Sequence, residues 1–296
     1  MSFIIFAEIT IITNIFILMF VIADSSSTRT EWVLVEKGKV IEHAITGGLN
    51  PYFQTRREIS HCIRLELPET FFKKRWDHVY YYGAGCANAE KCKIMESSLV
   101  AQFKTPVTVE SNLLGAARGL FVRKPGLACI IGTGSNSCIY DGEGIVKNIR
   151  SLGYILGDEG SGAYIGKSFV SDCLKELVPK ELADAFIEEY SINPDDVMDE
   201  IYLHAVASVL LSSYSNFLLK HLEHPYVHQL IYDSFMKFFT RNIASYDYDC
   251  HEISVVGSVA CNFATILNQA AKDFGVKIKK IVPSSMPGLI EFHSKK

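Results

Sequence analysis

Short apolar runs separated by small and polar residues dominate the first half of the chain. Apolar runs at residues 20–23, 32–36 and 40–44, joined by a Ser/Thr-rich turn and by Lys37-Gly38, predict three antiparallel strands. Beyond them the pattern predicts helices at 55–65, 88–102 and 113–120, with strands at 79–82 and 107–109. A meander followed by alternating strands and helices is typical of a mixed sheet with helices on its faces.

The same order begins again near residue 127. An apolar strand at 127–131 is followed by a loop of small residues and by a second strand at 137–140. The pattern is then mainly helical from 163 to 246, and it ends with a strand at 253–256, a helix at 260–274, a strand at 276–282 and a short helix at 287–293. Two copies of strand, loop and strand predict two similar α/β domains that face a cleft.

The composition narrows the functional classes. The 296 residues are 48% hydrophobic and 21% charged, enough for about two domains with full cores. A net charge of -4 and no long run of Lys or Arg argue against a nucleic acid partner. Eight cysteines without a CxxC pair predict reduced thiols and a cytoplasmic protein.

The N-terminus has three competing interpretations. Residues 3–23 carry one charge, Glu8, and are about long enough to span a bilayer. Met19 directly precedes the first predicted strand, so we expect residues 1–18 to be a hydrophobic extension from an upstream start codon. An N-terminal membrane anchor and a cleaved signal are the alternatives, although the first residues lack the Lys or Arg of a signal peptide.

Two loops have the composition of phosphate-binding turns. Asp24 ends the first strand and is followed by small hydroxyl residues and a cation, namely Ser25, Ser26, Ser27, Thr28 and Arg29. Backbone N–H groups and hydroxyls in such a turn can hold phosphate oxygens, and the carboxylate can hold hydrated Mg²⁺. A plain hairpin loop can have the same composition. An equivalent second loop strengthens the prediction; it comprises Gly132, Thr133, Gly134 and Ser135. The glycines of this second loop let a phosphate approach the backbone closely. No GxxxxGK[ST] motif is present, which excludes a P-loop protein.

A third motif places two adjacent acids, Asp158 and Glu159, between glycines and before a helical run. The acids could contact the hydroxyls of a polyol held close to the backbone. Equally, Ser161 is a good N-cap residue, and the motif could simply begin a helix. Spacing alone does not distinguish the two interpretations.

Seven motifs in the same order resemble bacterial N-acetylglucosamine kinase-like proteins of the BadF/BadG/BcrA/BcrD ATPase family; they are residues 23–32, 46–51, 83–86, 113–120, 131–137, 157–162 and 257–260. The similarity covers residues 19–293. It implies two actin-like (ribonuclease H-like) ATPase domains, residues 19–122 and 123–285, with an interdomain nucleotide cleft. Residues 286–296 would form a terminal helix that packs back on the N-terminal domain.

The resemblance also implies roles for particular residues. ATP, Mg²⁺ and an amino sugar such as N-acetylglucosamine would be the ligands, and a homodimer is expected because dimers are common in the family. Asp24 would bind Mg²⁺, and both loops would bind phosphate groups of ATP. Gly257 and Ser258 would lie against the adenosine. The acceptor site would comprise Gly48, Asn50, Asn112, Asp158 and Glu159.

Several positions depart from the family pattern. Ser25, Arg29 and Glu31 replace the usual Gly, Lys and Asp, and Asn112 stands where the family has the aspartate that acts as general base. Asparagine cannot accept a proton, and a positioned base contributes about 10²–10⁴-fold in rate. Phosphoryl transfer nevertheless depends mainly on positioning and charge stabilisation, so a weakened kinase is one hypothesis.

The second hypothesis is a sensor or pseudokinase that binds ATP and sugar without turnover. Glu110 would share a strand face with Asn112 if the strand extends that far, which makes Glu110 a candidate substitute base. A third alternative, an iron–sulfur activator from the other branch of the family, would need cysteines in a cluster-binding context. None of the eight cysteines has a recognisable context of that kind.

Overall fold

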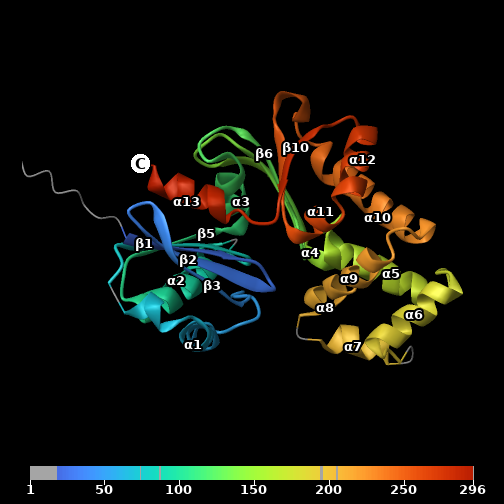
Figure 1. The fold of residues 1–296 in the computed structure, drawn as a ribbon, viewed down its shortest axis with the longest axis horizontal. Helices are drawn as coiled ribbons and strands as arrows, with labels where there is room; N and C mark the ends of the chain where they lie inside the picture. Colours follow the sequence, from blue (N-terminus) through green and yellow to red (C-terminus); the bar gives the residue numbers. More distant parts are fainter. Residues whose placement is uncertain (1–18, 74, 87, 194–195, 205, 296) are drawn as a thin grey trace, which may run out of the picture.

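The computed structural model describes residues 19–73, 75–86, 88–193, 196–204 and 206–295. The predictions for residues 1–18 lie outside this part of the chain. Two α/β lobes lie side by side, each built on a five-stranded mixed sheet (Figure 1). The strand order is β3-β2-β1-β4-β5 in the first sheet and β10-β9-β6-β7-β8 in the second. The predicted α/β class with two similar sheets is therefore confirmed.

The first sheet opens with the predicted meander. Its strands are β1 (Met19–Ser25), β2 (Arg29–Glu36), β3 (Lys39–Gly47), β4 (His78–Gly83) and β5 (Val107–Ser111). Strands β1, β4 and β5 run parallel, so their carboxyl ends meet at one edge. One face packs on α1 (Arg56–Glu66) and α2 (Ala89–Phe103), with the short helix η1 (Glu69–Phe72) beside them.

The second sheet repeats the arrangement. Its strands are β6 (Gly126–Ile131), β7 (Ser135–Tyr140), β8 (Ile145–Ile149), β9 (Ile253–Val256) and β10 (Ile278–Val282), of which β6, β9 and β10 are parallel. Strand β8 was not predicted, because three of its five residues are exposed and it offers no apolar run.

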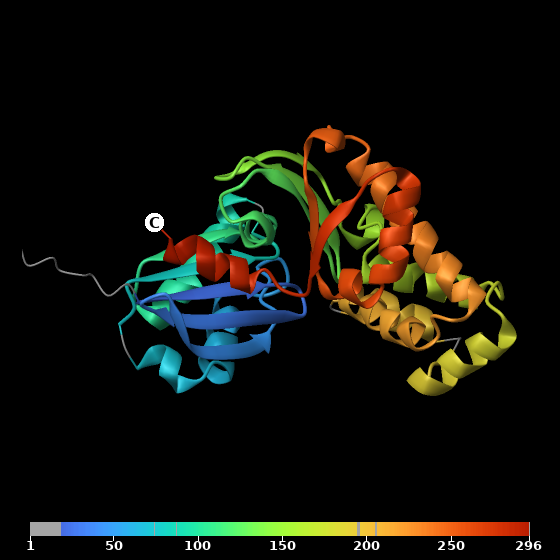
Figure 2. The same ribbon diagram turned by 45° about the horizontal axis from the view of Figure 1, so that its top comes forward.

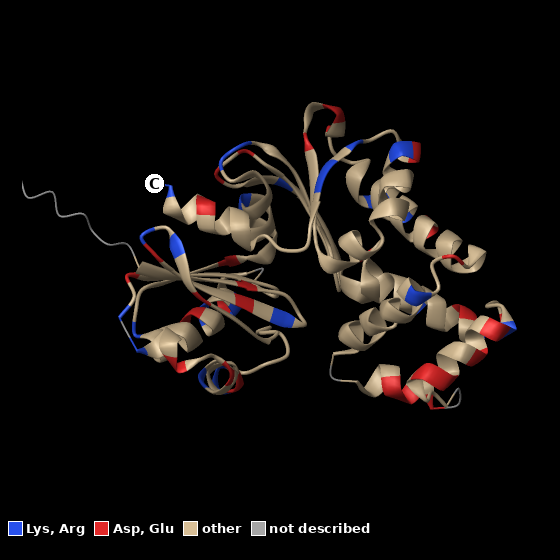
Figure 3. Cartoon of the chain, viewed as in Figure 1, with Lys and Arg blue, Asp and Glu red and all other residues tan. Residues whose placement is uncertain are grey.

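Helices cover the second sheet and extend away from it. They are α4 (Gly153–Leu156), α5 (Gly162–Leu174), α6 (Lys180–Tyr190), α7 (Val197–Leu203), α8 (Ala207–Ser213), α9 (Ser215–Lys220), α10 (Pro225–Phe238), the π-helix η2 (Phe239–Ile243), η3 (Tyr248–Cys250), α11 (Ser258–Asn262) and α12 (Ala264–Phe274). Aspartate and glutamate gather on α6 and α7, whereas Lys and Arg are spread over both lobes (Figure 3).

Two helices connect the lobes. Helix α3 (Asn112–Phe121) leads from β5 to β6, and α13 (Met286–Ser294) follows β10 and returns to the first lobe (Figure 2). Met286 and Leu289 of α13 are buried against Phe20 and Ile22 of β1. The two helices that connect the lobes also pack on each other.

The crossing of α3 and α13 depends on glycine. A Cβ atom at Gly288 would lie far inside van der Waals contact with the carbonyl of Gly119, a backbone group that cannot rotate away. We therefore expect Gly288→Ala to force the helices apart and to lower the free energy of unfolding by about 3 kcal/mol, as overpacking does. Urea unfolding measures the change.

Gly144→Ala is the matched control, because a Cβ atom there would meet no atom within 4 Å. Its unfolding midpoint should stay close to that of the wild type. Equal midpoints for Gly288→Ala and Gly144→Ala would mean that the helices can separate at no cost.

No helix in the described ranges combines the length and the apolar character needed to cross a bilayer. All eight cysteines are free thiols, but they are not all core residues as their apolar surroundings in the sequence predicted. Three of them are buried, namely Cys86, Cys129 and Cys138.

Candidate functional site

A cleft of about 760 Å³ lies between the lobes. Much of its lining comes from residues that follow three parallel strands in each sheet, because the carboxyl ends of these strands face the same space. In the first lobe these residues are Ser26 to Thr28 after β1, Ala84 and Gly85 after β4, and Asn112 after β5; in the second they are Gly132, Gly257 and Pro283.

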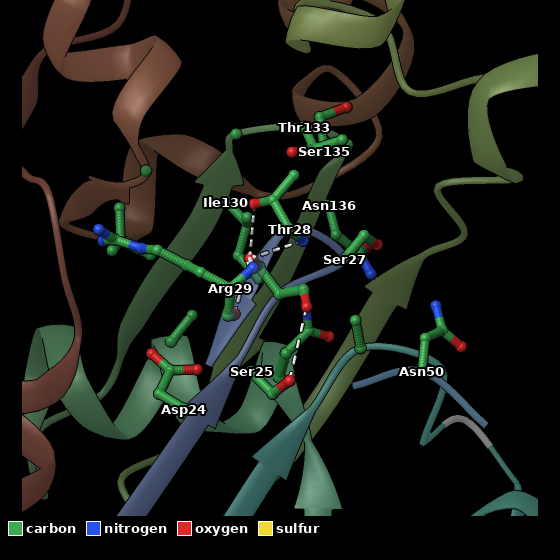
Figure 4. Close-up of a pocket in the computed structure, with 18 of the residues that line it drawn as sticks. Asp24, Ser25, Ser27, Thr28, Arg29, Asn50, Ile130, Thr133, Ser135 and Asn136 are labelled. Carbon is green, nitrogen blue, oxygen red and sulfur yellow. Dashed lines mark hydrogen bonds between the residues drawn. The ribbon is translucent and has the colours of Figure 1, made fainter. Parts of the chain in front are cut away.

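The first predicted loop is a tight turn between β1 and β2. Ser26 N–H donates to the Arg29 carbonyl at 2.9 Å, and Ser26 Oγ accepts from Arg29 N–H at 3.2 Å. Gly48 supports the turn from behind and does not line the cleft; any side chain at this position would collide with the carbonyl groups of Ser26 and Ser27. Thr28 and Arg29 are exposed and extend into the cleft (Figure 4).

Ser25 has a structural role within the same turn. It is fully buried, and its hydroxyl forms a hydrogen bond of 2.8 Å with Thr30 and accepts from Leu49 N–H at 3.3 Å. The Ser25 side chain is therefore already satisfied, and phosphate binding by this loop would rely on the residues that follow it.

Asp24 is a half-buried carboxylate at the end of β1. It lies opposite Glu31 in the β1–β2 ladder and accepts a hydrogen bond from Ser285 Oγ. Burial raises the pKa of Asp24 to about 6, Glu31 adds to the shift, and Ser285 and Arg29 oppose it. A carboxylate that is costly to ionise in this position fits a hydrated Mg²⁺, whose charge would stabilise the anion. Among the described residues, no group of three or more His, Cys, Asp or Glu side chains could hold a metal.

The second loop is bonded to the acidic motif. Ser135 N–H donates to Asp158 Oδ1 at 3.2 Å, and Ser135 Oγ donates to the Glu159 carbonyl at 2.8 Å. A Cβ atom at Gly134 would lie 3.0 Å from Asp158 Oδ2, so glycine leaves space for the carboxylate. Thr133 continues the loop toward the cleft (Figure 4). The two motifs predicted separately thus form one unit.

The two adjacent acids point in different directions. Asp158 lines the cleft, is 8% exposed and has a φ of 55°, which is uncommon for a non-glycine residue. Burial raises the pKa of Asp158 to about 6; Glu159 adds to the shift, and the N–H of Ser135 and Lys167 oppose it. Glu159 does not line the cleft: its carboxylate lies 2.6 Å from Arg241 Nε. Ser161 also caps α5, so the prediction that this motif begins a helix is confirmed.

Asn50 lies on the wall opposite Asp158. Its Oδ1 accepts from Tyr52 N–H at 3.0 Å, which leaves the amide NH₂ as the end that can donate to a ligand. Tyr52 and Phe53 line the cleft beside it, and both side chains are more than half exposed. This corner of the cleft combines a hydrogen-bond donor with two aromatic rings.

Asn112 and Glu110 are separated by the end of β5. Asn112 is the first residue of α3, which is capped by Ser111, and it lines the cleft. Glu110 lies opposite Tyr82 in the β4–β5 ladder and is not part of the cleft lining. Because the strand stops at Ser111, the shared strand face that would make Glu110 a substitute base does not form.

The remaining predicted residues lie on the far wall. Gly257 has a φ of 139° and approaches the carbonyl of Ile131 so closely that no side chain would fit; Ser258 beside it is exposed in the cleft. Sequence reasoning missed Ser284 and Ser285, although they follow the predicted strand β10 as other site residues follow their strands. Ser284 Oγ donates to Glu31 Oε2 at 2.7 Å, so both serines connect the second lobe to carboxylates of the first.

A solved structure from Porphyromonas gingivalis, a proposed N-acetylglucosamine kinase, superposes with a TM-score of 0.89 at 36% sequence identity, covering 94% of this chain and 99% of that one. The chain belongs to the family of N-acetylglucosamine kinase-like proteins. This family is part of the actin-like ATPase superfamily, so the predicted fold family is confirmed.

More distant structures share the fold of this N-acetylglucosamine kinase-like protein. A proposed N-acetylglucosamine kinase from Chromobacterium violaceum matches with a TM-score of 0.72 at 16% identity, covering 93% of this chain and 99% of that one. A proposed N-acetylmannosamine kinase from Listeria monocytogenes matches with a TM-score of 0.51 at 14% identity, covering 92% and 96%. No protein-family model and no curated protein sequence matches the chain.

The raised pKa of Asp158 predicts a pH-dependent stability for this kinase-like protein. Since its pKa is about 6 in the folded chain against 3.8 ordinarily, ionisation costs stability as the pH rises from about 4 to about 6. Asp158→Asn keeps an acceptor for Ser135 N–H and removes the charge. We expect it to raise the free energy of unfolding above pH 6 by on the order of 2 kcal/mol, measured by thermal unfolding as a function of pH.

Asp141→Asn is a control of opposite sign. Asp141 is exposed, and hydrogen bonds from the N–H groups of Gly144 and Glu143 lower its pKa. Its ionised form therefore favours folding above about pH 4, and the asparagine variant should be slightly less stable at neutral pH. A stability gain for Asp158→Asn that is the same at all pH values would contradict the assignment.

Proposed function

We propose that the protein is an ATP-dependent kinase that phosphorylates a hydroxyl group of an amino sugar such as N-acetylglucosamine. The observation that carries this proposal is the arrangement of one cleft with phosphate-sized loops on both walls and with Asp24 and Asp158 near them. The name of the Porphyromonas gingivalis relative supports the choice of acceptor.

The roles of the residues follow from their positions. The backbone N–H groups and hydroxyls of Thr28, Thr133 and the neighbouring loop residues would bind the phosphates of ATP, with Arg29 neutralising charge. Mg²⁺ would supply charge stabilisation for the transferred phosphoryl group. Asp24 would hold the hydrated cation, and Gly257 and Ser258 would form the wall against the adenosine.

The acceptor would bind beside the phosphate loops, next to Asp158, which is bonded to Ser135 of the second loop. Asp158 can accept hydrogen bonds from sugar hydroxyls, and the NH₂ group of Asn50 can donate one to a sugar oxygen. A site built on such hydrogen bonds disfavours acceptors that lack the matching hydroxyls. Asn112, at the start of α3, would contact the reacting hydroxyl without being able to take its proton.

Asn112 favours a second candidate function, a sensor that binds ATP and sugar but does not transfer phosphate.

Under either function we propose two domains, residues 19–122 and 123–285, followed by the terminal helix at 286–296. We also propose that the protein belongs to the BadF-type branch of the family, is cytoplasmic and forms a homodimer. Binding of the ligands in the cleft would bring the lobes together and exclude water.

Coupled ADP release by the full chain with Mg²⁺·ATP tests the proposal. A panel of amino sugars is compared with the rate without sugar, and isothermal titration measures sugar binding in parallel. Turnover of N-acetylglucosamine well above the sugar-free rate supports the kinase. Sugar and ATP binding without turnover would support the sensor, and binding of neither would overturn both.

A further inference from the structure

Glu159 is a buried carboxylate outside the cleft. Only 6% of the residue is exposed. Its Oε1 lies 2.6 Å from Arg241 Nε, and its Oε2 accepts a hydrogen bond from Asn242 Nδ2 at 3.4 Å. Most of the Arg241 side chain is exposed, so a surface cation compensates a buried anion. A buried carboxylate that loses its cation is strongly unfavourable.

Both partners of Glu159 come from one unusual turn. Arg241 and Asn242 are consecutive residues of η2, where α10 widens into a π-helix closed by a hydrogen bond of 2.9 Å from Ala244 N–H to the Phe239 carbonyl. Single π-turns interrupt α-helices at an energetic cost and are frequent near functional sites. In this chain the turn presents a cation and an amide to the same carboxylate.

The turn that contains Glu159 also contacts the second loop, on the side that faces the cleft. The Glu159 carbonyl accepts the hydrogen bond from Ser135 Oγ, and Asp158 Oδ1 accepts from Ser135 N–H. Gly160, with a φ of 77°, lies directly against Phe238 at the end of α10. The turn of residues 158–160 is therefore held between η2 on the outside and the second loop on the inside.

We propose that Arg241, assisted by Asn242, is a positioning residue that holds Glu159 outward and thereby fixes Asp158 and Ser135 in the cleft. Neighbouring carboxylates repel each other, and the ion pair on the outside leaves only Asp158 facing the ligand. The inference rests on the proposed function for the identity of that ligand, and it assigns to Glu159 a role in positioning in place of sugar contact.

Arg241→Gln in the full chain tests the proposal by two readouts. Hydrogen exchange is expected to rise about tenfold in peptides that contain residues 132–136 and 157–163 and to stay unchanged in the first sheet. In the ADP-release assay, kcat/KM for the sugar is expected to fall about 10- to 100-fold, because small displacements of positioning groups are costly. Arg241→Lys, which keeps the charge, should restore most of the loss.

Lys237→Gln is the matched control. Lys237 is exposed on α10, one helical turn before Arg241, and its Nζ lies 5.5 Å from the centre of the Tyr164 ring. The variant therefore removes the same charge without affecting the ion pair of Glu159. Unchanged exchange in Arg241→Gln, or the same change in Lys237→Gln, would overturn the proposal. If Arg241→Gln does not fold, Asn242→Ala provides the test, with a smaller rise expected in the same peptides.

The two proposals can fail separately. A wild-type chain that releases no ADP with any sugar, together with the local exchange increase in Arg241→Gln, would remove the kinase function and leave the positioning role. Normal turnover in Arg241→Gln with exchange like that of the wild type would leave the kinase function and remove the positioning role.

Discussion

Asn112→Asp is expected to raise the rate of sugar-dependent ADP release by about 10²-fold or more, the contribution of a positioned general base. The side chain at this position lines the cleft at the first residue of α3. A carboxylate at a helix N-terminus is favoured by the helix dipole, so the variant should fold as the wild type does. Initial rates at saturating Mg²⁺·ATP and sugar measure kcat directly.

Glu110→Gln is the paired control for this variant. Glu110 lies outside the cleft lining, and we expect its amide variant to leave the wild-type rate unchanged. If Glu110→Gln abolishes turnover and Asn112→Asp has no effect, Glu110 supplies the base through a conformation that differs from this one. An inactive wild type with an active Asn112→Asp variant would identify the natural protein as a sensor derived from a kinase.

Asp24→Asn is expected to lower kcat by about 10³-fold, equivalent to roughly 4 kcal/mol of transition-state stabilisation. Asparagine keeps an oxygen that can accept from Ser285 Oγ, so the connection between the lobes is retained, but it removes the anionic ligand that we propose for the cation. Because the pKa of Asp24 is raised to about 6, loss of the charge should not destabilise the chain at neutral pH.

Glu31→Gln removes the neighbouring charge and is the control for Asp24→Asn. Glu31 lies opposite Asp24 in the β1–β2 ladder and accepts a hydrogen bond from Ser284. We expect kcat of Glu31→Gln to fall less than about tenfold, because the Glu31 charge affects Asp24 only through electrostatic repulsion. Binding of Mn²⁺ in the presence of ATP, followed by electron paramagnetic resonance, should weaken in Asp24→Asn alone. Equal losses in both variants would show that Asp24 is not the specific ligand.

Much of the fold could be predicted from local patterns. Strands β1, β6 and β9 are mostly apolar and almost entirely buried, which is the pattern of strands covered on both faces. Strand β8 was missed because it is paired on one side and mostly exposed, so its conformation depends on its neighbour β7 and not on its own residues. The other border strands, β3, β5 and β10, were predicted because each contains apolar residues next to a turn signal or a helix.

The site was predictable where a residue follows a buried strand. Asp24 lies at the end of such a strand, Thr133 and Gly257 follow one, and the structure brings all three to one cleft. Glu159 shares the motif with Asp158, but a single residue along the chain reverses the direction of its side chain. Ser285 was missed because its contribution depends on Asp24, which lies 261 positions away.

The sequence by itself determined the two sheets, the two small-residue loops and the replacement of the expected base by Asn112, since each depends on residue type and local order. Only the tertiary structure decided that Glu159 faces Arg241, that Gly48 supports the first loop and that Ser284 and Ser285 connect the lobes. These features follow from contacts between segments far apart in the chain. Such contacts select one direction for a side chain whose local conformational preferences allow several.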